Sequence, residues 1–164
     1  GNYNKHVSLN KRIIMLNVGD KAPEFTLQNQ NGESVSLSDY KNQEVVIWFF
    51  PKASTPGWTN EGIGFRDELE KYSKLKIAVL GVSADSPKKQ KKFVDKYDFN
   101  YPMLCNETHD MLESYGVWGL KKFMGREYMG ISRVTYIISE EGFIETVYSK
   151  VKPLSHAKDI LKDY

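Results

Sequence analysis

The residues best suited to chemistry lie in one short segment, Pro51 to Thr59, directly after a strongly apolar run. Threonine is a good N-cap and proline suits the first turn of a helix, so Thr55-Pro56 predicts a helix start. The free N–H groups and the positive end of the helix dipole favour an anion or a thiolate there. A cysteine at such a place has a lowered pKa and is nucleophilic at neutral pH. The segment instead carries Trp58, and the single cysteine of the chain is Cys105.

Two apolar runs predict the elements that position this segment. Val45–Phe50 and Ile77–Val82 are apolar or small at every position, as expected of strands buried on both faces. Between them, three apolar residues have helical spacing: Phe65, Leu69 and Tyr72. Gly62 and Gly64 weaken that helix. The pattern predicts a strand–helix–strand unit with parallel strands, and ligands in such sheets bind at the carboxyl ends of the strands.

The remaining sequence predicts further helices and hairpins. Turn dipeptides Asn31-Gly32 and Glu141-Gly142 are each flanked by short apolar segments and predict two hairpins. The other expected elements are a helix over 87–97, a strand over 101–105, a short helix over 110–115 and a closing helix over 154–161. Together they predict an α/β fold with a mixed central sheet, parallel strands in the middle and a hairpin on one side.

Composition limits the class of protein. With 164 residues, 40% of them hydrophobic, we expect one domain over residues 17–164, and an N-terminal extension or expression remnant over residues 1–16. One cysteine excludes an internal disulfide framework and a cysteine-based zinc site. A net charge of +2 gives no reason to expect nucleic-acid or membrane partners. The start of the chain has no signal-peptide pattern, so we expect a cytoplasmic protein, without metal or cofactor.

Five segments, taken together, resemble the peroxiredoxins, and most closely their bacterioferritin-comigratory-protein (Q-type) branch. The segments are Pro51-x-x-x-Thr55-Pro56-Gly57-x-Thr59 with Glu61, Val18 to Phe25, Gly81 to Ser86, Tyr115 to Gly119, and Phe123 to Ile131 with Arg133. The resemblance implies a thioredoxin-like fold with helices on both faces of the sheet and an N-terminal hairpin. It implies a thiol-dependent peroxidase that reduces hydrogen peroxide or organic hydroperoxides, regenerated by thioredoxin or a similar donor. Q-type members are often monomers, so we expect a monomer.

The resemblance also assigns roles to individual residues. Pro51 would shield the site and Thr55 would hydrogen-bond the peroxide or the thiolate. Arg133 would keep the thiolate ionised and polarise the O–O bond, with Glu61 orienting the arginine. The attacking cysteine of the family falls on Trp58. The resolving cysteine of many members falls on Ile63, so neither redox position carries sulfur.

Indole has no ionisable nucleophile near neutral pH, so the chain as written should not reduce peroxides by the family mechanism. Three explanations of Trp58 stay open: an engineered or cloning substitution, a native selenocysteine whose codon differs by one base, or a gene that has lost the enzyme and kept the fold. The alternative function is a peroxiredoxin-fold binding module without catalysis.

Other reactive or clustered residues have plainer interpretations. Cys105 is expected to be a small buried hydrophobic residue rather than a surrogate nucleophile, one strand beyond the neighbour of the active-site strand. No metal is expected at the histidines: His6 lies in the possible N-terminal remnant, and His109 and His156 are expected at the surface. A lysine cluster is interpreted as a solvated helix face: Lys88, Lys89, Lys91 and Lys92. A loop rich in aromatic residues has two open interpretations. It lies at the surface, where it shapes the mouth of a pocket or contacts a partner, or it packs in the core. Its residues are Trp118, Phe123, Tyr128 and Met129.

Overall fold

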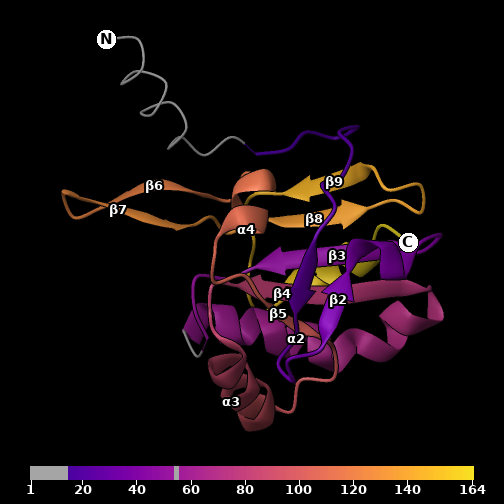
Figure 1. Ribbon diagram of the computed structural model, residues 1–164. Helices are drawn as coiled ribbons and strands as arrows, with labels where there is room; N and C mark the ends of the chain where they lie inside the picture. The colour runs from indigo at the N-terminus through magenta and orange to yellow at the C-terminus, as the bar shows by residue number, and fades with distance from the viewer. Residues whose placement is uncertain (1–14, 54–55) are drawn as a thin grey trace.

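The computed structural model describes residues 15–53 and 56–164, in which helices pack on both faces of a seven-stranded sheet (Figure 1). The strands of this sheet are β1 (Thr26–Gln28), β2 (Ser34–Ser36), β3 (Glu44–Phe49), β4 (Ile77–Ser83), β5 (Met103–Cys105), β8 (Thr135–Ile138) and β9 (Ile144–Tyr148). Their spatial order is β2-β1-β5-β4-β3-β8-β9. The helices are η1 (Leu37–Tyr40), α2 (Pro56–Lys74), α3 (Pro87–Tyr97), α4 (Asp110–Ser114) and α5 (His156–Leu161).

The centre of the sheet is the predicted strand–helix–strand unit. Strands β3 and β4 pair in parallel from Glu44 opposite Ile77 to Phe49 opposite Val82, and α2 connects them. Strand β5 extends the parallel set on the far side of β4. The N-terminal hairpin β1–β2 joins one edge of the sheet through β5, and the hairpin β8–β9 joins the other edge through β3. Both predicted hairpins are present, and short antiparallel pairs cover both edges of the sheet.

The central run over 45–50 is apolar at every position because both faces of β3 are covered. Val45, Ile47 and Phe49 lie in a buried cluster with residues of η1 and α4. Val46, Trp48 and Phe50 lie in a second cluster, which includes residues of α2, α3 and α5. Successive side chains of a strand point to opposite faces, so one strand supplies both clusters. A thioredoxin-like fold with helices on both faces is confirmed.

Two glycines of α2 have different surroundings and give a matched stability test. A Cβ at Gly62 would lie 3.0 Å from Phe99 Cζ and 3.1 Å from Trp48 Cη2, whereas a Cβ at Gly64 would lie 3.5 Å from Ala157 Cβ. Both rings near Gly62 are buried and cannot withdraw. We expect Gly62→Ala to destabilise the protein by roughly 1–3 kcal/mol through overpacking.

Gly64→Ala is the control for that substitution. It makes only an ordinary contact and removes the entropic cost of a helical glycine, so we expect it to stabilise by roughly 0.5–1 kcal/mol. Urea unfolding of both variants measures the two changes. Equal effects of the two substitutions would contradict the packing explanation, and would leave helix propensity as the common cause.

The segment expected to be an aromatic loop forms a separate two-stranded sheet instead. Strands β6 (Trp118–Phe123) and β7 (Arg126–Ile131) pair with each other and extend away from the main sheet (Figure 1). Phe123, Tyr128 and Met129 are exposed, so the core-packing alternative was wrong for them. Trp118 is partly buried, and its ring stacks on His109 with 4.0 Å between ring centres.

Within residues 15–53 and 56–164, no helix combines the length and the apolar character needed to cross a membrane.

Candidate functional site

The fold brings three distant segments together at the carboxyl end of β3. Strand β8 runs antiparallel to β3, with Thr135 opposite Trp48, and the N–H of Phe49 donates to the carbonyl of Val134 at 3.2 Å. The residues that lead into β8 therefore lie where β3 ends. Helix α2 begins a few residues further along from β3, at Pro56. This geometry places Arg133 beside the first turn of α2.

Trp58 and Arg133 are in direct contact. The guanidinium carbon of Arg133 lies 4.3 Å from the centre of the Trp58 ring, a cation–π arrangement. The same guanidinium donates a long hydrogen bond from Nη2 to the carbonyl of Gly57 at 3.4 Å. Both side chains are only partly exposed. The indole therefore covers the guanidinium on the first turn of the helix.

Glu61 lies one helical turn further along α2 and is 1% exposed. Its Oε2 is 3.8 Å from Nε of Arg133, beyond hydrogen-bond distance, and neither atom has a hydrogen-bond partner among the described residues. Burial raises the pKa of the Glu61 carboxyl to about 8, although Arg133 acts in the opposite direction. The acid is neutral below that pH, so it leaves the positive charge of Arg133 uncompensated.

The loop between β3 and α2 is fixed by an aspartate from the neighbouring strand end. The carboxylate of Asp85 accepts hydrogen bonds from the N–H of Ala53 at 2.8 Å and from Oγ of Ser83 at 2.7 Å. Pro51 lies at the bend directly after β3 and is partly buried. Asp85 was not predicted as a site residue, although a carboxylate just after a buried strand is a usual signal of a site. Thr55 lies outside the described residues.

His156 is buried, at 3% exposure, so the expectation of a surface histidine was wrong. It is the first residue of α5, which packs against α2, and its ring meets the edges of the Phe65 and Tyr148 rings. Its Nε2 lies 3.0 Å from Oγ1 of Thr135 and 3.7 Å from Oε1 of Glu61. Burial is the main cause that lowers the pKa of His156 to about 4. His6 lies outside the described residues, and His109 is partly exposed.

The two buried groups predict how stability depends on pH. The folded protein keeps the Glu61 proton up to about pH 8, whereas an unfolded chain releases it near the ordinary value of 4.5. The unfolded chain takes up a proton on His156 below 6.5, and the folded protein does so only near 4. The two contributions cancel between pH 4.5 and 6.5. From pH 6.5 to 8 the Glu61 contribution acts alone, so stability should fall with pH, by roughly 2 kcal/mol in total.

Urea unfolding at pH 6.5 and pH 8 measures this fall in the free energy of unfolding. The Glu61→Gln variant has no carboxyl group to titrate at this position, so its stability should not fall over the same range. A decline of the same size in Glu61→Gln and in the unmodified protein would show that another group is responsible.

Cys105 is the buried residue that the sequence predicted. It ends β5, one strand beyond β4, and its Sγ lies 3.8 Å from the carbonyl of Asn29. Burial and nearby carboxylates raise the pKa of its thiol to about 12. A thiol that stays protonated is a poor nucleophile, so Cys105 is not a substitute for a reactive residue at position 58. Ile63, on α2, is partly buried against the apolar cluster that includes Trp58.

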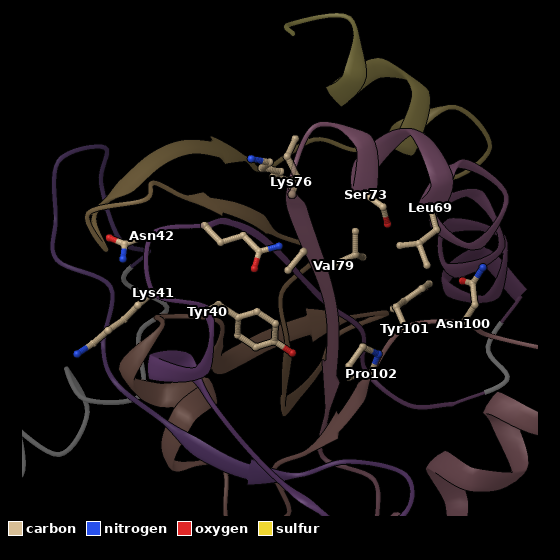
Figure 2. Close-up of a pocket in the computed structure, with 13 residues that line it drawn as sticks. Tyr40, Lys41, Asn42, Leu69, Ser73, Lys76, Val79, Asn100, Tyr101 and Pro102 are labelled. Atoms are coloured by element: carbon tan, nitrogen blue, oxygen red, sulfur yellow. The ribbon is translucent and has the colours of Figure 1, made fainter.

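Two hollows among the described residues have walls that do not include Trp58 or Arg133. One of about 510 Å³ lies at the amino ends of β3 and β4, where Tyr40, Leu69 and Ser73 face it (Figure 2). Another, of about 470 Å³, lies beside the loop after β3 and is lined by Lys52, Ala53, Asp85, Phe93 and three lysines of α3. Among the described residues, no group of three histidine, cysteine or acidic side chains is arranged to hold a metal ion.

A thioredoxin-like sheet, a helix that starts beside an arginine and the order of the motifs together define a thiol-peroxidase class of protein. The chain belongs to the AhpC/TSA family, whose model matches residues 18–147. It is 42% identical over 146 residues to peroxiredoxin Bcp of Escherichia coli, covering 89% of this chain and 94% of that relative. It is 41% identical over 149 residues to peroxiredoxin Bcp of Bacillus subtilis, covering 91% and 95%.

Solved structures give the same result. A PrxQ mutant from Xylella fastidiosa superposes with a TM-score of 0.85 at 30% identity, covering 92% of this chain and 96% of that one. Peroxiredoxin Q from Xanthomonas campestris superposes with a TM-score of 0.80 at 32% identity, covering 85% and 88%. The predicted resemblance to Bcp/PrxQ peroxiredoxins is confirmed. Proteins of this family act on peroxides with thioredoxin-type reductants.

Proposed function

We propose that this chain is a Bcp/PrxQ thiol-peroxidase scaffold in which Trp58 occupies the position of the attacking cysteine, so that the chain as written does not reduce peroxides. The observation that carries the proposal is the contact of Trp58 with Arg133, at 4.3 Å from ring centre to guanidinium carbon. A much smaller cysteine at position 58 would leave that space to the substrate. Its thiolate would lie near both the guanidinium and the N–H groups of the first helical turn.

The surrounding residues support this assignment by their chemistry. A guanidinium fixed beside a thiol favours its ionised form and stabilises charge that develops on a peroxide oxygen. Because Glu61 is neutral below about pH 8, it does not neutralise the positive charge of Arg133 at neutral pH. In this proposal Pro51 shields the site and Thr55 hydrogen-bonds the peroxide. Ile63 stands at the resolving position, so a second thiol has to come from elsewhere.

Trp58 itself favours a second candidate, a binding module without catalysis. Its ring stacks on Arg133 and packs against a buried apolar cluster, as a residue with a structural or binding role would. The codon at position 58 separates the candidates. A native tryptophan codon supports the binding module, whereas a cysteine codon or an in-frame selenocysteine codon supports the peroxidase scaffold.

Peroxide consumption in the presence of thioredoxin, thioredoxin reductase and NADPH tests the proposed inactivity. We expect the unmodified chain to consume hydrogen peroxide no faster than its Cys105→Ser variant, because the Cys105 thiol stays protonated at neutral pH. Sustained thioredoxin-dependent turnover by the unmodified chain would overturn the proposal.

The same proposal covers the location, the oligomeric state and the partners of the protein. It is a cytoplasmic monomer that receives electrons from a thioredoxin-like protein and binds neither nucleic acid nor membrane. Sedimentation equilibrium tests the monomer. A stable dimer at micromolar concentration would contradict it.

A further inference from the structure

His156 is a buried polar group that lies outside the contact between Trp58 and Arg133. Its ring is enclosed by Phe65 of α2 and Tyr148 of β9, with ring centres 5.6 Å and 5.4 Å away. Its Nε2 is directed at Oγ1 of Thr135, 3.0 Å away, and Oε1 of Glu61 lies 3.7 Å from the same nitrogen. A buried imidazole at this place has to be explained by what it contacts.

Glu61 has a different neighbour on each oxygen. Oε1 faces His156 and Oε2 faces Arg133, at 3.7 Å and 3.8 Å. The glutamate is 1% exposed, and Oε2 has no hydrogen-bond partner among the described residues. His156 and Arg133 therefore face the two oxygens of a buried carboxyl group. Arg133 in turn donates from Nη2 to the carbonyl of Gly57, and its guanidinium carbon lies 4.3 Å from the centre of the Trp58 ring.

We propose that His156 is a positioning residue for Arg133: its Nε2 keeps Glu61 facing the guanidinium, and Glu61 in turn keeps the guanidinium over position 58. This inference rests on the proposed function of the Trp58–Arg133 site and adds to it a residue from the C-terminal helix. The line of contact runs from α5 through α2 to the segment before β8.

The titratable and charged groups around His156 determine its protonation state. Glu61 faces it from α2, Arg133 from the segment before β8, Tyr148 from β9 and Asp159 from α5 itself. Burial lowers the pKa of His156 most, Asp159 raises it and Arg133 lowers it. The ring is neutral near pH 7, so its 3.7 Å contact with Glu61 is a polar contact and not an ion pair.

Two polar substitutions separate Nε2 from the rest of the ring. The amide nitrogen of glutamine reaches the place of Nε2, whereas that of asparagine reaches only the place of Nδ1. In the unmodified chain, carboxyl ¹³C NMR, assigned with Glu61→Gln, follows the Glu61 titration. We expect His156→Asn to raise its midpoint from about 8 by roughly half a unit or more, since the polar contact of Nε2 with the charged carboxylate is lost. His156→Gln should leave the midpoint in place.

The same pair is then compared in a Trp58→Cys, Cys105→Ser background, where the thiolate absorbance of the introduced cysteine reports the field of Arg133. His156→Asn should slow the reaction of this cysteine with hydrogen peroxide roughly tenfold and raise its thiol pKa by about one unit, and His156→Gln should restore both. His109→Gln, at the other histidine among the described residues, is the control and should change neither.

Equal behaviour of His156→Asn and His156→Gln in both measurements, whether both unchanged or both altered, would overturn the positioning role. Thermal melts of the two variants separate a general loss of packing from a local effect. If the introduced cysteine in the parent background has an ordinary thiol pKa and no peroxide reaction, it is the proposed function that fails. The Glu61 titration in the unmodified chain still decides the role of His156.

Discussion

Replacing Trp58 with cysteine is expected to turn the chain into a thioredoxin-dependent peroxidase. The rate of peroxide consumption should rise by about a thousandfold or more, since loss of a catalytic nucleophile costs up to about 10⁶-fold in other enzymes that form covalent intermediates. The physical reason is that the site already holds an uncompensated guanidinium beside the start of α2. The site lacks a group that can be oxidised, and the second thiol has to come from elsewhere.

The measurement is NADPH oxidation coupled through thioredoxin, in a Cys105→Ser background that leaves a single thiol. Trp58→Ser is the matched control, because it opens the same space without introducing sulfur. We expect Trp58→Cys to turn over and Trp58→Ser to stay at the level of the unmodified chain. An inactive, folded Trp58→Cys protein that also fails to form a sulfenic acid with peroxide would falsify the scaffold hypothesis.

In that Trp58→Cys background, Arg133→Met is expected to reduce the reaction with hydrogen peroxide by about 100-fold. Methionine keeps much of the apolar side chain but removes the cation, so the pKa of the introduced thiol should rise by roughly one to three units. Stabilisation of the leaving oxygen is lost in the same step. Arg133→Lys should recover part of the rate, since it restores the charge without the planar fork.

Stopped-flow oxidation of the introduced thiol across a range of pH measures both quantities in the Arg133 variants. Arg126→Met is the control: it removes the same charge from an exposed position on β7, at the start of the strand that leads toward Arg133. A loss of rate of similar size in Arg126→Met and Arg133→Met would point to net charge rather than to the local contact.

The central fold was predictable because its residues follow simple rules. The apolar runs of β3 and β4, the spacing of Phe65 and Tyr72, and the proline at the start of α3 each have one local interpretation, which the structure confirms. The hairpin β6–β7 was missed because both of its strands are largely exposed and carry glycine, so the alternation of a half-buried strand is absent.

The candidate site was predicted in part. Trp58, Glu61 and Arg133 were expected together from motif order, and the structure brings them into one group. His156 was missed because a single histidine in a polar C-terminal segment has no local signal of burial. Its place depends on the docking of α5 onto α2, a contact between distant segments that includes the hydrogen bond from Tyr72 to the carbonyl of Ala157.

Because Trp58 stacks on Arg133, its intrinsic fluorescence reports on the surroundings of Arg133. The three tryptophans have unlike surroundings: Trp48 is enclosed between Phe50 and Phe65, Trp118 lies on His109, and Trp58 lies on a guanidinium. Emission from Trp58 should therefore respond to whatever approaches or displaces Arg133, including an anion. If the proposed function holds, the residue at the position of the attacking cysteine makes the occupancy of this site visible without any added label.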